Sequence, residues 1–332
     1  MSRGMQRQPT RRQTHRLRRK PPPRWSRWPL YGLFYGLGFP LTRVLAVFGR
    51  WPRALSSWMR RMLVRAGTYT PTDRDVLVCS YFKTGTNWTM QIALQVAHRG
   101  EAHFDHIHDL VPWIDIDPRA RFAVPATDDS LWQNCPTGLR IIKTHAGFDH
   151  LAYRPEARYI WVVRDPKDVF VSSYHFIKSV TLGRLMPTLE QWLELFLSPH
   201  TLFGSWARHV DSGWRNRHRD NVLFLTYEEM KADLPAAVRK IAALMRVELS
   251  PGELDRVVEQ SSFAHMKSIS HKFDMIEMPW TRPHGAMVRR GERGSADELL
   301  DPAQKRRIDD YWREELRQLG SDFPYDERFG QV

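Results

Sequence analysis

The stretch SYFKTGTNW, residues 80–88, follows the apolar run VLVC at 76–79 and precedes TMQIAL at 89–94. A strand, a short turn and a helix are therefore expected in that order. The first N–H groups of a helix lack partners and form the positive end of its dipole. Gly85 lets the backbone approach a ligand closely and Lys83 adds a full charge, so the turn favours an oxyanion such as phosphate or sulfate. The alternative is a strand–helix connection with an incidental lysine.

The spacing differs from that of the nucleoside triphosphatase loop, G-x-x-x-x-G-K-[ST]. In that loop the lysine directly follows the last glycine, whereas Lys83 stands two residues before Gly85. Ser80 also occupies the position where the first glycine would be required. The sequence therefore predicts an anion-binding loop of another kind.

Composition indicates a folded chain with a sizeable core. The 332 residues are 42% hydrophobic and include 13 Trp and 16 Phe, enough for one large α/β domain or two small ones. The only two cysteines, Cys79 and Cys135, form neither a disulfide framework nor a zinc-binding pattern. A reducing compartment fits best, so we expect a cytoplasmic protein.

The net charge of +13 is concentrated at one end of the chain. Residues 1–72 contain 16 Lys or Arg and no acidic residue, and the first acid is Asp73. The remaining residues hold 34 basic and 37 acidic side chains and are nearly neutral. Nucleic-acid binding is disfavoured, because it would be expected to place a basic patch on a folded domain.

Three properties distinguish the N-terminal segment. Residues 1–27 are polar and Arg-rich and are expected to be disordered. Residues 28–48 are apolar but interrupted by prolines and glycines, and 53–67 form a basic amphipathic helix pattern. Residues 28–66 are therefore predicted to lie on an anionic membrane surface, peripherally on its cytoplasmic face, with residues 1–66 as the membrane-binding part. The alternatives are docking of this helix on the catalytic domain and, less favoured, a true membrane span.

The rest of the chain alternates short apolar runs with helical patterns. Such runs are typical of strands buried on both faces of a parallel sheet, and the alternation predicts a three-layer α/β fold with a P-loop-like central parallel sheet flanked by helices. Ligands of such folds bind at the carboxyl ends of the strands. The predicted strands are 75–80, 139–145, 158–164 and 221–227, and three of the predicted helices are 87–98, 167–177 and 236–245.

Further charged motifs follow the other predicted strands. KTH at 143–145 offers a cation and a general base, although a lone histidine is more often structural. In VVRDPKDVFVSSYHF, Arg164 ends a strand and Ser172 lies about two turns into the next helix, so both can hold one phosphate. RRGERG at 289–294 offers two more guanidinium groups among glycines. Ordinary surface charge or ion pairing is the alternative for each.

Taken together, these motifs strongly resemble those of the sulfotransferases that use 3′-phosphoadenylyl sulfate. The resemblance keeps the family order and extends from residue 75 to about 320, and it implies a sulfotransferase domain over 67–332. The matching stretches are YFKTGTNW at 81–88, KTH at 143–145, RDPKDVFVSSY at 164–174, LTYEEM at 225–230 and RRGERG at 289–294.

The resemblance assigns roles to individual residues. The 5′-phosphosulfate of the donor is expected on the loop made of Lys83, Thr84, Gly85, Thr86, Asn87 and Trp88. The 3′-phosphate is expected at Arg164, Ser172 and Arg289, with Arg290 and Gly291 beside it. The positions that match the family's adenine site are Trp88, Tyr227, Ser261 and Phe263.

Sulfuryl transfer resembles phosphoryl transfer, an in-line displacement with a loose transition state. The resemblance implies that Lys83 and Lys143 stabilise the sulfuryl oxygens and the leaving phosphate, while His145 removes the proton from the acceptor hydroxyl or amine. A general base typically contributes ~10²–10⁴-fold. No metal is expected, because the fixed cations take the place of Mg²⁺. The alternatives are a kinase-like P-loop enzyme and a non-catalytic, membrane-associated nucleotide-binding protein.

The acceptor is expected to be a small molecule in an apolar pocket, with lipid-like molecules among the candidates. HFDHIHD at 103–109 is interpreted as part of this pocket and not as a metal site, since it lacks cysteine and a single helical face. Trp113, Trp132, Phe148 and residues 265–285 are predicted to add to the pocket. The chain also departs from the family pattern, because Phe82 replaces the usual proline and no dimerisation motif is recognisable near the C-terminus.

Overall fold

The computed structural model describes residues 61, 63–117, 122–201, 203–275 and 295–330. The predicted tail at 1–27 and the apolar run at 28–48 lie outside these residues. So do Arg289, Arg290 and Gly291. In the described part of the chain, no helix is both long and apolar enough to cross a membrane.

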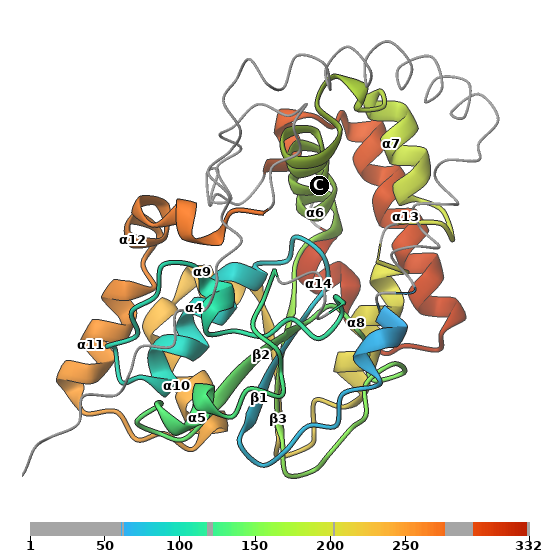
Figure 1. The fold of residues 1–332 in the computed structure, drawn as a ribbon. Helices are drawn as coiled ribbons and strands as arrows, with labels where there is room; N and C mark the ends of the chain where they lie inside the picture. The colour runs from blue at the N-terminus through green and yellow to red at the C-terminus, as the bar shows by residue number, and fades with distance from the viewer. Residues whose placement is uncertain (1–60, 62, 118–121, 202, 276–294, 331–332) are drawn as a thin grey trace, which may run out of the picture.

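A four-stranded parallel sheet with the order β2-β1-β3-β4 forms the centre of the fold (Figure 1). Its strands are β1 (Asp75–Ser80), β2 (Arg140–Thr144), β3 (Arg158–Val163) and β4 (Val222–Thr226). Each lies within one residue of its predicted bounds. Because all four strands run in one direction, their carboxyl ends meet at one edge of the sheet.

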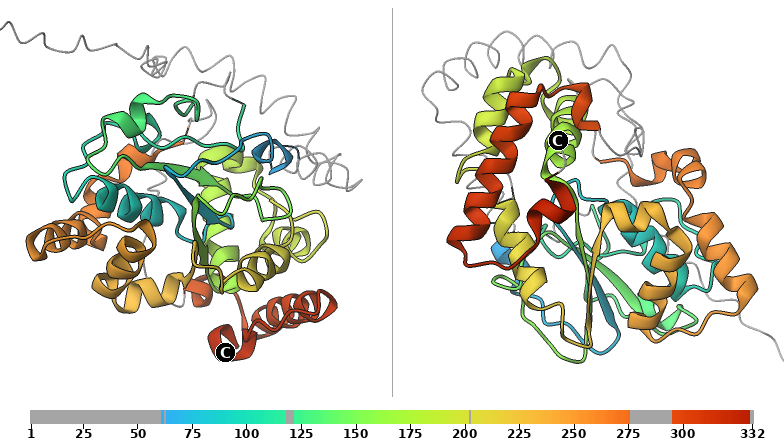
Figure 2. Two further views of the ribbon diagram at one scale, coloured as in Figure 1. Left: turned by 90° about the horizontal axis from the view of Figure 1, so that it is seen from below. Right: turned by 180° about the vertical axis from the view of Figure 1, so that it is seen from behind.

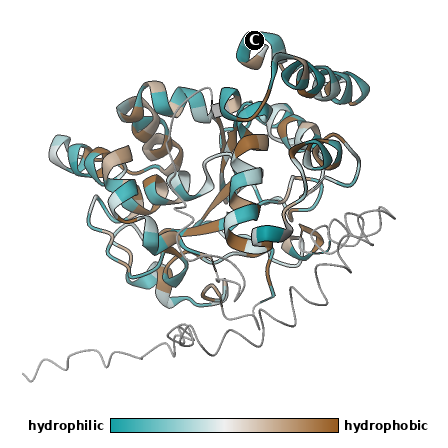
Figure 3. Cartoon of the chain, turned by 90° about the horizontal axis from the view of Figure 1, so that it is seen from above, coloured by the Kyte–Doolittle hydropathy of each residue, from teal (hydrophilic) through white to brown (hydrophobic). Residues whose placement is uncertain are grey.

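Successive strand residues face opposite layers of helices, as the two-residue period requires. Val76 and Val78 of β1 pack into one apolar cluster, whereas Leu77 and Cys79 pack into another. Helices α4 (Thr86–Ala97), α10 (Leu234–Met245) and α11 (Pro251–Gln260) cover one face. Helices α6 (Pro166–Phe176), α7 (Leu189–Phe196), α8 (Trp206–Arg215) and α13 (Pro302–Gln318) lie on the other (Figures 1 and 2). Apolar residues follow the strands between the two layers (Figure 3). The predicted three-layer α/β fold is confirmed.

The helices begin where the sequence places starting signals. Asp165 accepts a hydrogen bond from the backbone N–H of Lys167, and Pro166 occupies the first turn of α6. Thr226 and Glu229 form a capping box at the start of α9. The helices are α4 (Thr86–Ala97), α5 (Ser130–Gln133), α6 (Pro166–Phe176), α7 (Leu189–Phe196), α8 (Trp206–Arg215), α9 (Tyr227–Ala232), α10 (Leu234–Met245), α11 (Pro251–Gln260), α12 (Phe263–Ser268), α13 (Pro302–Gln318) and α14 (Tyr325–Phe329).

A buried ion pair closes the amino-terminal edge of the sheet. Asp75 accepts a 2.9 Å hydrogen bond from Arg140 Nε and a 2.6 Å bond from the hydroxyl of Tyr69. Just before them in the chain, Leu63 and Ala66 are buried in the cluster that includes Leu77. The last part of the predicted 28–66 segment therefore packs on the α/β core.

Candidate active site

The loop after β1 is held in shape by its own hydroxyl groups. Thr84 Oγ1 donates to the carbonyl of Tyr81 at 2.8 Å and lies 3.1 Å from that of Val162. Lys83 and Gly85 both have positive φ, 69° and 103°. A Cβ on Gly85 would lie 2.8 Å from the ring of Tyr227, so glycine is required here for both backbone and packing reasons. The loop delivers the chain to α4, whose N-terminus has no side-chain cap.

His145 follows β2 directly and is buried. Its Nδ1 lies 2.7 Å from the carbonyl oxygen of Ser80. A carbonyl only accepts, so Nδ1 carries the proton and Nε2 keeps its lone pair. Burial, together with the nearby Lys143, holds the pKa of His145 well below its usual value. The imidazole is therefore neutral, with Nε2 ready to take a proton.

Lys143 lies next to this base and is only 5% exposed. Its Nζ is 3.4 Å from the centre of the Trp113 ring, a cation–π contact. Burial lowers the pKa of Lys143 to about 7; Asp115 acts in the opposite direction and Lys83 in the same one. Lys83 Nζ in turn lies 4.2 Å from the ring centre of Phe176.

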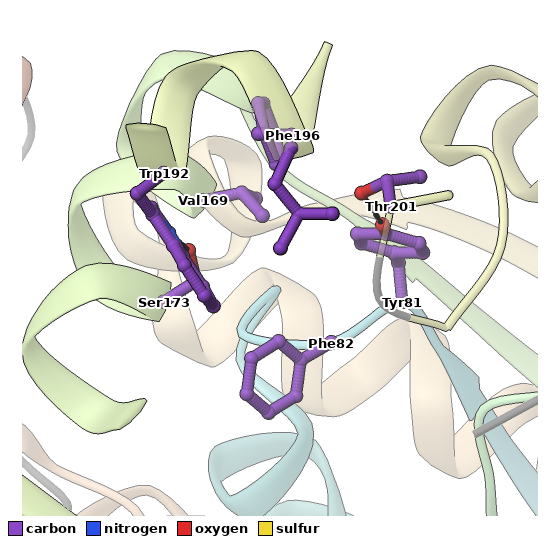
Figure 4. Close-up of a pocket in the computed structure, with 8 residues that line it drawn as sticks. Tyr81, Phe82, Val169, Ser173, Trp192, Phe196 and Thr201 are labelled. Carbon is purple, nitrogen blue, oxygen red and sulfur yellow. Dashed lines mark hydrogen bonds between the residues drawn. The ribbon is translucent and has the colours of Figure 1, made fainter. Parts of the chain in front are cut away.

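Aromatic rings surround the histidine. Phe203 and Trp113 lie 5.0 and 5.5 Å from the His145 ring, and Phe82 lies 6.5 Å from it. Phe82 also stacks on Phe203 at 4.7 Å and borders a small apolar cavity formed mainly by α6, α7 and the loop after β1 (Figure 4). This position, where the family pattern has proline, is therefore filled by a ring that packs against the base.

A second cluster forms where β3 and β4 end. The Arg164 guanidinium carbon lies 4.4 Å from the ring centre of Tyr227, and that ring lies 5.4 Å from Trp88. Trp88 Nε1 donates to the carbonyl of Ser261 at 2.6 Å. Among the described residues, the buried Arg164 Nε and Ser261 Oγ have no hydrogen-bond partner. Aromatic faces beside unsatisfied donors suit a purine and a phosphate.

The remaining predicted site residues differ in how far they are buried and in what they contact. Thr84 and Thr86 are buried, whereas Asn87 and Ser172 are partly exposed. Phe263, at the start of α12, is 42% exposed. Trp113 lies in the site, but two of the aromatic residues predicted to line the acceptor pocket do not. Trp132 packs against Arg74 before β1, and Phe148 stacks on Trp161 in the core.

The predicted pocket histidines have structural partners. His108 Nδ1 donates to the carbonyl of Val111, and its ring stacks on Trp113 at 5.7 Å. His106 Nε2 lies 2.9 Å from the carbonyl of Asp274. Within the described ranges, no cluster of three or more His, Cys, Asp or Glu side chains could hold a metal ion. His108 therefore supports Trp113, the ring that contacts the amine of Lys143.

Sequence reasoning missed Asp115, a fully buried carboxylate. It accepts hydrogen bonds from the side chains of Trp113 and Thr144 and from the backbone N–H of His145. Burial raises the pKa of Asp115, while these hydrogen bonds act against the rise. The available signal was an acidic residue within the mostly apolar run VPWID at 111–115.

An anion loop, two lysines and a neutral histidine thus lie at one edge of a parallel sheet, an arrangement that suits transfer of a group from an anionic donor. Comparison with known proteins identifies the class, because the sulfotransferase domain family matches residues 73–320. The chain belongs to this family, and the assignment as a sulfotransferase is confirmed. The kinase-like alternative is thereby set aside.

Curated relatives and a solved structure agree with this assignment. The chain is 28% identical to rat sulfotransferase 2A6, covering 87% of this chain and 96% of the relative. It is 29% identical to the rabbit amine sulfotransferase over 80% and 88% of the two chains. The crystal structure of mouse sulfotransferase SULT7A1 complexed with PAP has a TM-score of 0.60 and 25% identity, and the match covers 80% of this chain and 90% of that one.

The buried amine of Lys143 gives a stability prediction that does not depend on activity. Because the pKa of Lys143 is lowered to about 7 in the folded protein, the unfolded chain binds more protons than the folded one between pH 7 and the ordinary lysine pKa. The buried amine therefore lowers the free energy of unfolding most below pH 7, and this effect decreases as pH rises. Lys143→Met should raise the free energy of unfolding by roughly 1–3 kcal/mol at pH 6, and by less at pH 9.5, in urea titrations.

Lys167 provides the matched control. It is equally buried, but its Nζ donates to Asp309 at 2.6 Å and to the carbonyl of Phe329 at 2.7 Å. Lys167→Met should therefore lower the free energy of unfolding, because the buried Asp309 carboxylate loses its cation and keeps only the hydroxyl of Tyr325, while the Phe329 carbonyl loses this donor. Destabilisation by Lys143→Met at pH 6 would contradict the assigned cost of burying this amine.

Proposed function

We propose that this sulfotransferase moves the sulfuryl group of 3′-phosphoadenylyl sulfate to a hydroxyl or amine of a small molecule, with His145 as general base. The observation that carries the proposal is the meeting of Lys83, Lys143 and the neutral Nε2 of His145 at the ends of β1 and β2. These groups supply the two needs of the reaction, positive charge for the transferred group and a base for the acceptor.

The donor assignment rests on the second cluster and on the family. The mouse relative is described as complexed with PAP. PAP is 3′-phosphoadenosine 5′-phosphate, the nucleotide that remains after the donor has given up its sulfuryl group. In the part of this chain that the structure describes, Arg164 Nε and Ser261 Oγ are buried without hydrogen-bond partners, and Trp88 and Tyr227 offer aromatic faces. Arg164 and Ser172 would hold the 3′-phosphate, with Arg289, Arg290 and Gly291 completing its site. Trp88, Tyr227, Ser261 and Phe263 would surround the adenine.

The loop from Lys83 to Trp88 would hold the 5′-phosphosulfate at the N-terminus of α4. In the transfer, a bond forms between the acceptor oxygen or nitrogen and sulfur, while the bond from sulfur to the bridging phosphate oxygen breaks. The acceptor proton goes to Nε2 of His145, and the negative charge moves to the departing phosphate. Lys83 and Lys143 stabilise that charge, because a bound anion raises the pKa of a nearby amine and keeps it protonated.

The acceptor would bind against the rings of Phe82, Trp113 and Phe203, beside His145. Relatives named for their acceptors include the rabbit amine sulfotransferase and a guinea pig 3-beta-hydroxysteroid sulfotransferase. An apolar small molecule that carries one hydroxyl or amine fits such walls. Incubation with ³⁵S-labelled donor and a metabolite or lipid extract would identify the acceptor by its label.

The nucleotide site is tested by thermal unfolding with PAP. Ligand binding to the native state should raise the Tm of the wild-type protein. Arg164→Ala should abolish most of this shift, because a charge-assisted contact to phosphate is lost. Arg158→Ala, at the other end of β3, is the control and should keep the shift. An undiminished shift in Arg164→Ala would remove Arg164 from the site.

The base is tested by separating binding from transfer. His145→Ala should lose sulfuryl transfer by roughly 10²–10⁴-fold while keeping the PAP-induced shift, since the base acts on the acceptor. Lys83→Ala should impair both measurements. The control is His218→Ala, which changes an exposed histidine between α8 and β4. Near-normal turnover of His145→Ala with nucleotide bound would mean that another group removes the acceptor proton.

We further propose that the catalytic unit begins near Arg61 and that the residues before it bind an anionic membrane surface. Leu63 and Ala66 are core residues, which supports starting the unit before them. Each basic residue near such a surface contributes ~1 kcal/mol. The full chain should therefore pellet with phosphatidylserine vesicles and partly resist high salt, whereas a chain beginning at Arg61 should stay in solution and still bind PAP. Equal behaviour of the two chains would exclude the membrane proposal.

A further inference from the structure

Asp115 has no role in the mechanism above, yet its hydrogen bonds all lead to the active site. Oδ1 accepts from the hydroxyl of Thr144 at 2.6 Å. Oδ2 accepts from Trp113 Nε1 and from the backbone N–H of His145, both at 2.7 Å. The carboxylate is fully buried, so these three donors replace the water that would otherwise solvate it.

The three donors are neighbours of Lys143 in sequence or in space. Thr144 and His145 follow it in sequence, and Trp113 holds its amine. The backbone adds two hydrogen bonds, from Lys143 N to the carbonyl of Pro112 at 2.8 Å and from Ile114 N to the carbonyl of Lys143 at 3.2 Å. The segment 112–115 therefore fixes the end of β2 at the residue that carries the amine.

The charge of Asp115 also acts on this amine. The titratable groups around it come from several elements. They are Lys83 from the loop after β1, His108 before β2, His145 after β2 and His209 of α8 beside His145, with Cys79 of β1 near Asp115. Among these groups only Asp115 is a carboxylate. It raises the pKa of Lys143, whereas burial, the largest cause, and Lys83 lower it.

We propose that Asp115 is a positioning residue that acts through Lys143: it fixes the end of β2, and its negative charge keeps a fraction of the Lys143 amine protonated before the donor binds. The inference rests on the proposed role of Lys143 at the phosphosulfate. A protonated amine attracts the anionic donor at once, whereas a neutral amine must first take a proton from solvent. Asp115 thus reduces the number of protons that the site must take up from solvent when the donor binds.

Proton uptake during PAP binding measures this effect without knowledge of the acceptor. Calorimetric titrations in buffers of different ionisation enthalpy report how many protons the complex takes up. In the wild-type protein, Lys143 with a pKa of about 7 is about half protonated at pH 7, so about half a proton is taken up at this amine. In Asp115→Asn a larger fraction of the free amine is neutral at pH 7, so proton uptake should exceed the wild-type value and PAP binding should be weaker.

Asp75→Asn is the matched control. Asp75 is also fully buried and accepts from Arg140, Tyr69 and the backbone N–H of Thr72, but it lies at the opposite end of β1. It should lower stability and leave proton uptake at the wild-type value. Lys143→Met identifies the titrating group, because it should remove the uptake assigned to the amine and leave only that of the nucleotide phosphates.

The possible results distinguish the proposed donor site from the proposed role of Asp115. Absence of PAP binding to the wild-type protein would overturn the proposed donor site. Wild-type binding with equal proton uptake in Asp115→Asn would overturn the role of Asp115 and leave the donor site intact. If Asp115→Asn does not fold, Asp115→Ser, which leaves room for water, takes its place. A wild-type uptake that persists unchanged in Lys143→Met would also exclude the inference.

Discussion

The hydrogen bond from His145 Nδ1 to the carbonyl oxygen of Ser80 governs the arrangement of the catalytic groups. It joins the last residue of β1 to the first residue after β2, two strands that lie side by side in the sheet. The same bond decides the tautomer, because the carbonyl can only accept, and it leaves a lone pair on Nε2, the atom proposed to act as the base. The ends of these two strands also carry Lys83 and Lys143. Parallel strand order and one main-chain acceptor therefore bring the imidazole and both amines to one place.

This arrangement is expensive in folding free energy. Burial disfavours the protonated forms of Lys143 and His145, and within the described residues the buried Arg164 Nε and Ser261 Oγ at the same edge have no hydrogen-bond partner. The opposite edge is built differently, since Asp75 and Arg140 form a buried ion pair with further hydrogen bonds. The buried Lys143 and His145 thus destabilise the fold at the edge where the ligand is proposed to bind, as expected where activity competes with stability.

The sequence was sufficient for the parts of this architecture that depend on local pattern. Apolar runs predicted the four strands to within one residue, and the rule that parallel strands end together placed Lys83, His145 and Arg164 near one another. Contacts between distant segments could not be obtained in this way. Trp132 and Phe148 were assigned to the acceptor pocket because they are aromatic and lie near the motifs, but the turns around them direct one ring to Arg74 and the other to Trp161. Asp115 was missed because a buried carboxylate is recognisable only by its donors.

Phe82 illustrates how a departure from a motif is absorbed by its surroundings. Proline would fix the backbone of the loop directly, whereas Phe82 fixes it through its ring, which stacks on Phe203 and meets Phe176 edge-on at 5.4 Å. Phe176 also carries the contact to the Lys83 amine. The anion loop is therefore held by side-chain packing against α6 and Phe203, whereas proline would hold it through the main chain. Because Phe82 and Phe203 also border His145, the rings that hold the loop would form a wall of the proposed acceptor site, so a substitution in one is expected to affect the other.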